Sequence, residues 1–309
     1  MPADFTMNSK IFIEMTKNMI QKATVLRAIG SIFAYAVASF LFSGCFEQAA
    51  PKRDITSLSI ADAYEKRDSV EFINLSGATD IDALRQGVIG EFPALKKLSL
   101  RGLVEVDNIP FSAGVLSKVT YLDIASTGIK SVPEDMKALQ YLYMSDNKLS
   151  GLQLPFSKLD GLVYLNLDRN ELTNMPEEIG NLVSLKWLRL NNNILTSLPA
   201  SSAKFGNIRR LYLRENKFTE FPKEILSMSS LEELDIGGNM IKSIPDEIVN
   251  MPNLKRIDLD GNPIQKLPPD IGNMKNLTHL FINNCKISEE ERKRIRTSFP
   301  DKVRVHIAF

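Results

Sequence analysis

A motif of hydrophobic residues and one asparagine recurs along this chain at a fixed spacing, and this repeat limits the possible folds more than any other feature. Written L-x-x-L-x-L-x-x-N-x-L, it fits residues 139–149 and 162–172. Its first positions follow one another at 23-residue steps: Leu139, Leu162, Leu185, Ile208, Leu231, Leu254 and Leu277. Weaker copies begin at Val119, Leu95 and Val70, which gives about ten units. Such a chain is expected to stack one structural unit per repeat in a line.

Hydrophobic and variable residues alternate in the centre of each motif, as in Leu165-Asn166-Leu167. Successive side chains of a strand point to opposite faces, so the leucines should fill an interior column and the intervening residues should face outward. The asparagine stands where the chain leaves the strand. We expect its amide to bond turn backbone that would otherwise lose about 1–3 kcal/mol per unpaired group. The predicted ladder consists of Asn147, Asn170, Asn193, Asn216, Asn239 and Asn262.

The rest of several units shares an L-P-x-x-I-G-N-L pattern, seen in residues 175–182 and 267–274 and by half in 221–225 and 244–248. This pattern resembles the leucine-rich repeats of Ras-suppressor-like and Scribble-like proteins, plant Ras-group proteins and bacterial leucine-rich-repeat lipoproteins. The resemblance covers residues 70–287. It implies an α/β fold, a right-handed horseshoe-shaped solenoid with a parallel β-sheet on its concave face and caps at both ends. Proteins of this kind share a scaffold and differ in their partners.

Capping signals flank the repeats. Ser288 and Glu291 have the spacing of a capping box, which predicts a helix from Ser288 that ends before Pro300. Val303, Val305 and Ile307 then alternate like a closing strand. A weaker box at residues 59–62 predicts a short helix to about residue 67. We therefore expect an N-terminal cap over 55–69 and a C-terminal cap over 288–309, which cover the ends of the solenoid.

The first 44 residues are predicted to be a signal peptide. A head with four basic residues against two acidic ones precedes an uncharged run over 28–44. Leu41-Phe42-Ser43-Gly44-Cys45 resembles a bacterial lipobox, although Phe42 stands where that family prefers leucine. The resemblance implies lipid attachment at Cys45, with 45–54 as a tether. It also implies an exported protein anchored to a bacterial membrane, at the outer membrane or cell surface. The alternative is an uncleaved signal anchor in which Cys45 has no role.

Composition argues against several classes of function. The 38 basic and 37 acidic residues nearly balance, which lacks the basic excess of a nucleic-acid-binding protein. Two histidines and two cysteines provide little material for a metal site. No phosphate-binding loop or hydrolase motif occurs, so we expect no enzyme activity, cofactor or small-molecule substrate. Cys285 replaces the asparagine of the last full repeat, which favours a structural role, and His279 is expected to be an exposed strand residue.

The outward strand positions hold the candidate binding site. Neighbouring strands lie about 4.8 Å apart, so equivalent positions should form continuous rows. Hot spots of protein interfaces are enriched in tryptophan, tyrosine and arginine. The residues of these types that four adjacent strands bring together are Tyr141, Tyr143, Tyr164, Trp187, Arg189, Arg210 and Tyr212. Lys186, Arg209 and Arg214 border them and predict a positive flank, while the next strand is acidic. The competing interpretation is that these rings only stack across strands and stabilise the sheet.

Two classes of function remain. The first is a membrane-tethered module that binds a protein or peptide on its concave face. The second is a structural envelope protein whose repeats contact the cell wall or a neighbouring subunit. A cytosolic signalling scaffold is a third possibility if the chain has no signal peptide.

Overall fold

The computed structural model of the protein describes residues 63–64, 67–76, 88–103, 114, 116–299 and 306–308. All of them belong to the unit Thr56–Phe309. The predicted signal peptide, Cys45 and the tether lie outside the described residues. Of the predicted N-terminal cap, Ala63 and Tyr64 are helical, and the Tyr64 ring contacts the Phe92 ring edge-on at 6.4 Å.

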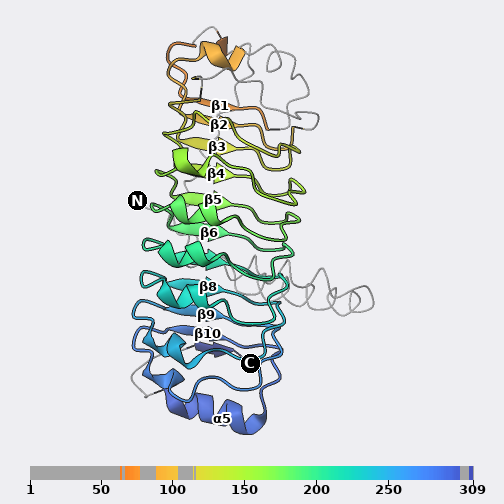
Figure 1. Ribbon diagram of the computed structural model, residues 1–309, viewed down its shortest axis with the longest axis vertical. Helices are drawn as coiled ribbons and strands as arrows, with labels where there is room; N and C mark the ends of the chain where they lie inside the picture. The colour runs from red at the N-terminus through yellow and green to blue at the C-terminus, as the bar shows by residue number, and fades with distance from the viewer. Residues whose placement is uncertain are drawn as a thin grey trace, which may run out of the picture. The chain divides into compact units, whose positions relative to one another are not determined.

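Each repeat forms one short strand, and the described strands pair in chain order as one open parallel sheet (Figure 1). The strands are β1 (Phe72–Asn74), β2 (Lys97–Ser99), β3 (Tyr121–Asp123), β4 (Tyr141–Tyr143), β5 (Tyr164–Asn166), β6 (Trp187–Arg189), β7 (Arg210–Tyr212), β8 (Glu233–Asp235), β9 (Arg256–Asp258), β10 (His279–Phe281) and β11 (His306–Ala308). The first ten match the ten predicted units. The predicted closing strand is confirmed at β11, which includes Ile307, whereas Val303 and Val305 lie outside the described residues.

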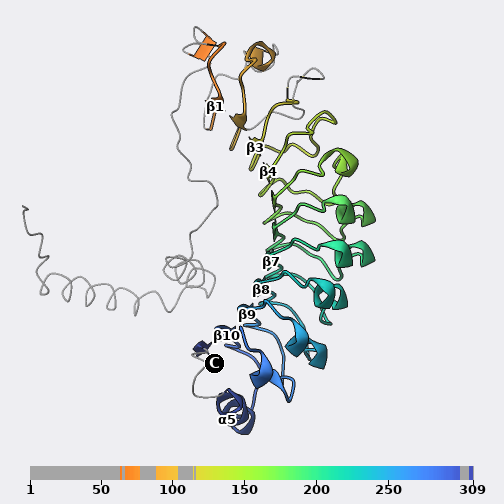
Figure 2. The ribbon, with the colours of Figure 1, turned by 90° about the vertical axis from the view of Figure 1, so that its left-hand side faces the viewer.

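Short 3-10 helices return the chain from the end of one strand to the start of the next, and they lie on the outer side of the curved stack (Figure 2). They are η3 (Val88–Glu91), η4 (Phe156–Lys158), η5 (Glu177–Asn181), η6 (Ala200–Lys204), η7 (Lys223–Ser227), η8 (Asp246–Asn250) and η9 (Ile271–Asn273). The L-P-x-x-I pattern explains η5, η7, η8 and η9. Proline fixes the backbone at the start of the turn, and its carbonyl accepts the N–H three residues later, as Pro176 does from Ile179 at 3.1 Å. The isoleucine then enters the core.

The interior column predicted from the leucines is confirmed. Leu142, Leu165, Leu188 and Leu211 are at most 1 % exposed, and they belong to one hydrophobic core that extends through all the described repeats. A single unit could not bury its own leucines, and stacking removes them from water at about 1.5–3 kcal/mol for each side chain. The protein is therefore the open parallel solenoid that the repeat predicts.

The asparagine ladder is also confirmed along its whole predicted length. Asn216 is representative: its amide donates to the carbonyl of Leu190 in the preceding repeat at 2.9 Å and to that of Leu213 in its own turn at 3.0 Å. Its oxygen accepts the N–H of Leu195 at 3.0 Å. Each rung thus connects two repeats, and its oxygen supplies the acceptor for a buried N–H of the preceding repeat.

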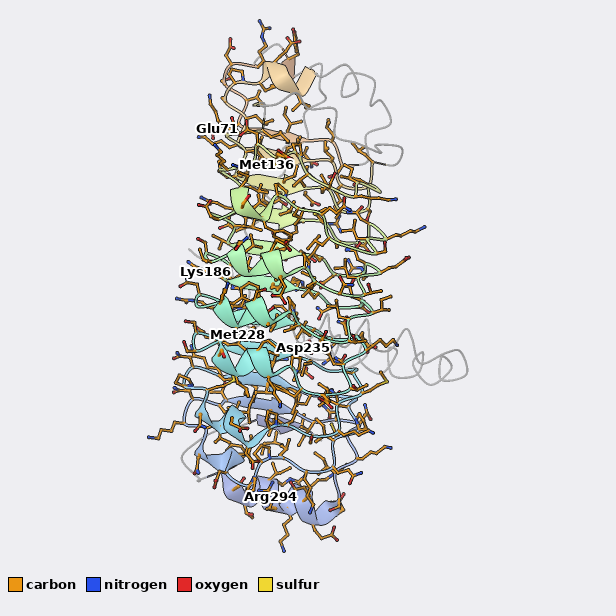
Figure 3. The ribbon with its side chains drawn as sticks, viewed as in Figure 1. Glu71, Met136, Lys186, Met228, Asp235 and Arg294 are labelled. Carbon is orange, nitrogen blue, oxygen red and sulfur yellow. The ribbon has the colours of Figure 1, made fainter. Side chains whose placement is uncertain are left out.

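The helix predicted from Ser288 is confirmed as α5 (Glu289–Ser298), with Ser288 as its N-cap. The Ser288 hydroxyl accepts the Glu291 N–H at 3.2 Å. Instead of returning to Ser288, the Glu291 carboxylate accepts the N–H of Leu267 at 3.0 Å and pairs with Arg294 at 2.7 Å. Arg294 also donates to the Leu267 carbonyl at 2.9 Å, so the pair attaches the helix to the last repeats (Figure 3).

The residue before each ladder position lies in the left-handed region of backbone conformation. Non-glycine residues occupy it in several turns, such as Arg169 at φ 53° and Glu215 at φ 55°, and Gly261 occupies it at φ 69°. This conformation costs an L-residue on the order of 1 kcal/mol or more. The turns therefore retain some strain wherever the residue is not glycine.

Replacing Gly261 by alanine should lower the free energy of unfolding by about 1 kcal/mol, because the new Cβ meets the left-handed backbone penalty. No neighbouring atom lies closer than 3.5 Å to that Cβ, so sterics add little. Gly206→Ala is the matched control: its φ is not in the left-handed region and its Cβ has room, so it should be neutral or stabilising by about 0.4–1 kcal/mol. Urea denaturation of the two variants measures the difference, and equal midpoints would contradict it.

Candidate partner-binding face

Residues at the third and fifth motif positions form two rows across the strands. The strands lie on the inner side of the curve in Figure 2. In the first row Tyr141 pairs with Tyr164, Tyr164 with Trp187, and Trp187 with Arg210. The second row runs parallel to it through Tyr143, Asn166, Arg189 and Tyr212. The strand register brings all seven predicted site residues onto four adjacent strands, β4 to β7.

Three tyrosines on this face form a second hydrophobic cluster, separate from the interior core. Tyr121, Tyr143 and Tyr164 are each less than 10 % exposed, and Tyr143 lies 5.2 Å from Tyr121 and 4.7 Å from Tyr164 between ring centroids. Tyr141 and Trp187 pack against this cluster and are half-buried. Tyr143 and Tyr164 therefore have a clear packing role across the strands, whereas Tyr141 and Trp187 retain surface for a partner.

Arginines stack on aromatic rings between β6 and β7. The Arg210 guanidinium lies over the Trp187 ring at 5.5 Å, and that of Arg189 over the Tyr212 ring at 5.0 Å. Each arginine also has a carboxylate partner. Arg189 Nε donates to Asp168 at 2.7 Å, and Arg210 lies 3.3 Å from Glu233. These contacts fix the side chains before a partner arrives, which reduces the entropy cost of binding.

The pKa shifts of these groups follow from their surroundings. Burial alone would lower the pKa of Arg189, but the charge and hydrogen bond of Asp168 together with Tyr164 and Tyr212 outweigh it, so the pKa is raised and the guanidinium stays charged. Burial and the Glu233 carboxylate both raise the pKa of Tyr212 well above its usual range. The Tyr212 hydroxyl therefore remains protonated and donates to Glu233 at 3.1 Å.

The predicted positive flank is wrong as an electrostatic description, because acids neutralise two of its three members. Arg209 pairs with Glu232 at 3.6 Å. Arg214 bridges Asp235 at 3.0 Å and Asp258 at 2.6 Å. Lys186, at the left edge of the stack in Figure 3, is exposed and has no ion pair among the described residues. Of the three flank residues, Lys186 therefore keeps a positive charge that is uncompensated within the described part of the chain, while Arg209 and Arg214 do not.

Arg214 reaches Asp258 by passing over Gly237. A Cβ at Gly237 would stand 2.7 Å from the guanidinium carbon, so a side chain there would displace the arginine. Burial and the neighbouring Asp235 carboxylate raise the pKa of Asp258 to about 7, in spite of the Arg214 charge. Asp260 adds negative charge nearby and accepts the N–H of Asn283 at 2.6 Å.

A third arginine–aromatic pair on this face was not part of the predicted site. Arg256 on β9 lies over the Phe281 ring on β10 at 4.2 Å, and His279 stacks on the same ring at 6.1 Å. His279 is half-buried on an outward strand position. The sequence pattern that predicts such a pair is an arginine and an aromatic residue at outward positions of adjacent strands. Trp187 and Arg210 follow the same pattern.

Family models for leucine-rich repeats match this chain over consecutive segments. One described as a leucine-rich repeat region matches 154–240, a two-copy model matches 229–269 and 252–291, and a single-repeat model matches 138–159. The chain is a leucine-rich-repeat protein. Solenoids of this family serve as scaffolds for protein–protein interaction, for which their extended concave surfaces are suited. No curated protein sequence matches the chain significantly.

Solved structures of other leucine-rich-repeat proteins share the fold. An internalin from Listeria monocytogenes is 19 % identical with a TM-score of 0.63, over 81 % of this chain and 70 % of that one. A chain of the Drosophila Toll–Spatzle complex is 21 % identical with a TM-score of 0.62, over 82 % and 36 %. The Arabidopsis receptor kinase HAESA, solved with a peptide hormone and a co-receptor, is 24 % identical with a TM-score of 0.57, over 71 % and 39 %. At these identities the likeness establishes the fold alone.

Cys285 has the structural environment that its place in a leucine-rich repeat predicts. Its thiol points to the Leu259 carbonyl of the preceding repeat at 3.4 Å, which reproduces one bond of an asparagine rung. Burial raises the pKa of this thiol to about 11, which disfavours the reactive thiolate. Among the described residues, no group of three or more histidine, cysteine or acidic side chains could hold a metal ion. No helix in the same part of the chain is long and apolar enough to cross a membrane.

Proposed function

We propose that this leucine-rich-repeat protein is a membrane-tethered recognition module that binds a protein partner on its concave face at β4 to β7. The observation that carries the proposal is the pair of arginine–aromatic stacks, Trp187 with Arg210 and Arg189 with Tyr212. Tryptophan, tyrosine and arginine dominate interface hot spots. Here they are half-buried, already held in place and adjacent to exposed surface.

Partner capture tests the binding face. Trp187→Ala and Arg210→Ala should each weaken capture by at least about 1–2 kcal/mol, because each removes a hot-spot side chain. The partner is first cross-linked to the protein on intact cells and identified, and its affinity for purified variants is then measured. Arg256→Ala is the matched control, since it removes an equivalent arginine from the stack on Phe281 outside the proposed site. Circular dichroism verifies that the variants fold, and unchanged affinity in folded Trp187 and Arg210 variants would place the site elsewhere.

The tether is proposed from the sequence of the N-terminal segment. We expect cleavage before Cys45 and a lipid on its sulfur, because a basic head and an apolar run precede Ser43-Gly44-Cys45. A lipid would hold the protein at a membrane, which suits a recognition module that faces the periplasm or the cell exterior. Mass spectrometry of the native N-terminus checks this prediction, with Cys45→Ser as the control that should remain unlipidated. An intact N-terminal methionine on the native protein would contradict it.

A further inference from the structure

The half-buried rings at the centre of the face carry hydrogen-bond donors that have no acceptor in the part of the chain that the structure describes. Among the described residues, neither the Trp187 indole N–H nor the Tyr141 hydroxyl bonds a protein group. The two residues occupy the same row on β6 and β4, with Tyr164 of β5 between them. Tyr164 is only 7 % exposed and lies recessed. We call the surface formed by Tyr141, Tyr164 and Trp187 the aromatic notch.

The spacing of the aromatic notch matches one particular ligand backbone. Its two walls stand on alternate strands, which are about 9.6 Å apart. A polyproline II helix repeats every three residues, or about 9.3 Å. A ligand in that conformation that crosses the strands can therefore place equivalent residues against both walls. An extended β-strand repeats every two residues, about 6.8 Å, and does not fit this spacing.

The Trp187 ring of the notch leaves little open face for stacking. Trp187 has Tyr164 on one side, with the two rings at 82° and 5.9 Å apart. Its other neighbour in the row is Arg210, whose guanidinium covers the ring at 5.5 Å. A sugar ring binds by stacking on an open aromatic face, and Tyr164 and Arg210 already occupy the space beside the Trp187 ring. A ligand that accepts hydrogen bonds from ring edges is better suited.

Charge favours an uncharged ligand at the notch. The two arginines nearest to it, Arg189 and Arg210, already face Asp168 and Glu233. A carboxylate-bearing ligand would compete with these acids, and a basic ligand would compete with the arginines. A proline-rich segment carries no charge, its prolines have no N–H, and the carbonyls of polyproline II have no internal partner. Such a ligand complements the unpaired donors on both walls.

We propose that the aromatic notch binds a proline-rich segment of the partner in the polyproline II conformation. The inference rests on the proposed function, since it names the chemistry of the partner at the same face. Binding of a preformed polyproline II helix costs little conformational entropy, and aromatic-lined surfaces are its usual receptors. The Tyr141 hydroxyl and the Trp187 N–H donate to two carbonyls one helical turn apart.

Trp187 reports on this site directly because it is the only tryptophan in the chain. The full chain in detergent is titrated with a capped decaproline peptide while the tryptophan emission is followed. We expect a saturable change. Decapeptides of alternating glycine and serine and of glutamate, together with a chitin hexasaccharide, are titrated in parallel and should give none.

Variants separate binding at the notch from binding elsewhere. Tyr141→Phe removes one hydrogen-bond donor and keeps the ring contacts, so it should weaken decaproline binding about two- to tenfold. Phe281→Leu removes an aromatic side chain from the same face on β10 and should leave the affinity unchanged. Trp187→Phe removes the indole N–H and also the fluorophore, so its binding is measured by isothermal titration calorimetry. Its affinity for decaproline should also fall about two- to tenfold.

The outcomes separate this inference from the proposed function. No saturable change with decaproline, an equal response to the glycine–serine peptide, or equal affinities for Tyr141→Phe and the unmodified chain would each overturn the inference. If the hexasaccharide binds instead, the notch recognises a glycan. The proposed function is tested separately, by the affinity of the variants for the identified partner. If decaproline does not bind while Arg210→Ala still weakens partner capture, only the inferred ligand chemistry is wrong. If both fail, the concave face is not the binding site.

Discussion

Asn216→Ala should destabilise the solenoid by about 1–3 kcal/mol, one of the two largest effects expected of a single substitution in this chain. The mutation leaves the Leu195 N–H without its acceptor. It also removes one of the two asparagine donors from each of the carbonyls of Leu190 and Leu213, which keep Asn193 and Asn239 as partners. Each buried group left unsatisfied costs about 1–3 kcal/mol, and relaxation recovers part of that cost. The two repeats that the rung connects both lose support.

Lys217→Ala is the matched control, since Lys217 is the next residue in the same turn and its side chain is exposed. It should change the free energy of unfolding by no more than about 0.5 kcal/mol. Urea denaturation followed by circular dichroism compares the two variants with the unmodified protein. Similar midpoints for Asn216→Ala and Lys217→Ala would show that the ladder does not hold the repeats together.

Asp258→Asn should stabilise the protein at alkaline pH and have little effect in acid. Burial and the Asp235 charge raise the pKa of Asp258 to about 7, so the folded state prefers the protonated acid. Because the pKa of Asp258 is higher in the folded protein than in the unfolded chain, where it is near 4, protonation of this group favours folding in acid. This contribution to the free energy of unfolding is complete below pH 4 and is lost as the pH rises through about 7. Asparagine mimics the protonated form at every pH. The variant should therefore gain on the order of 2–4 kcal/mol above pH 8 and nearly nothing at pH 4.

Thermal unfolding at a series of pH values measures this effect as the difference in Tm between Asp258→Asn and the unmodified protein. The difference should grow between pH 4 and pH 8 and then level off. Asp160→Asn is the control, because Asp160 is an exposed acid outside the sheet and its replacement should give a small difference at all pH values. A lower Tm for Asp258→Asn at pH 8 would mean that its ion pair with Arg214 outweighs burial.

Local patterns allowed most of the fold to be predicted from sequence. The alternation around Leu165 determines which face each side chain takes, and the 23-residue period determines which residues become neighbours across strands. Cross-strand pairs such as Tyr164 with Trp187 follow from these two regularities. The ladder followed as well, since each asparagine satisfies the same backbone groups in every turn. Ser288 predicted the start of α5 because capping depends on residues within one turn of the helix.

The details of the candidate site were harder to predict because they depend on packing depth and side-chain reach. Tyr143 and Tyr141 belong to the same strand and both face outward, yet neighbouring rings bury Tyr143 while Tyr141 is only half-buried. The positive flank failed for a similar reason. Arg214 reaches an acid two strands away only because Gly237 leaves the space open. No pattern within a single repeat predicts that contact.

The asparagine ladder ends before the N-terminal end of the stack. The interfaces between the first repeats are therefore expected to be weaker than those between the later ones. Thr127 takes the asparagine position in the unit of β3 and bonds the Ile124 carbonyl of its own turn at 2.7 Å, and Leu103 occupies the equivalent place in the unit of β2. From β3 onward, packing of the tyrosine cluster adds a second set of contacts between repeats on the concave side. In a linear array each interface resists separation by itself. Under tension or partial denaturation, we therefore expect β1 and β2 to separate from the stack first, while the aromatic face on β3 to β7 stays folded.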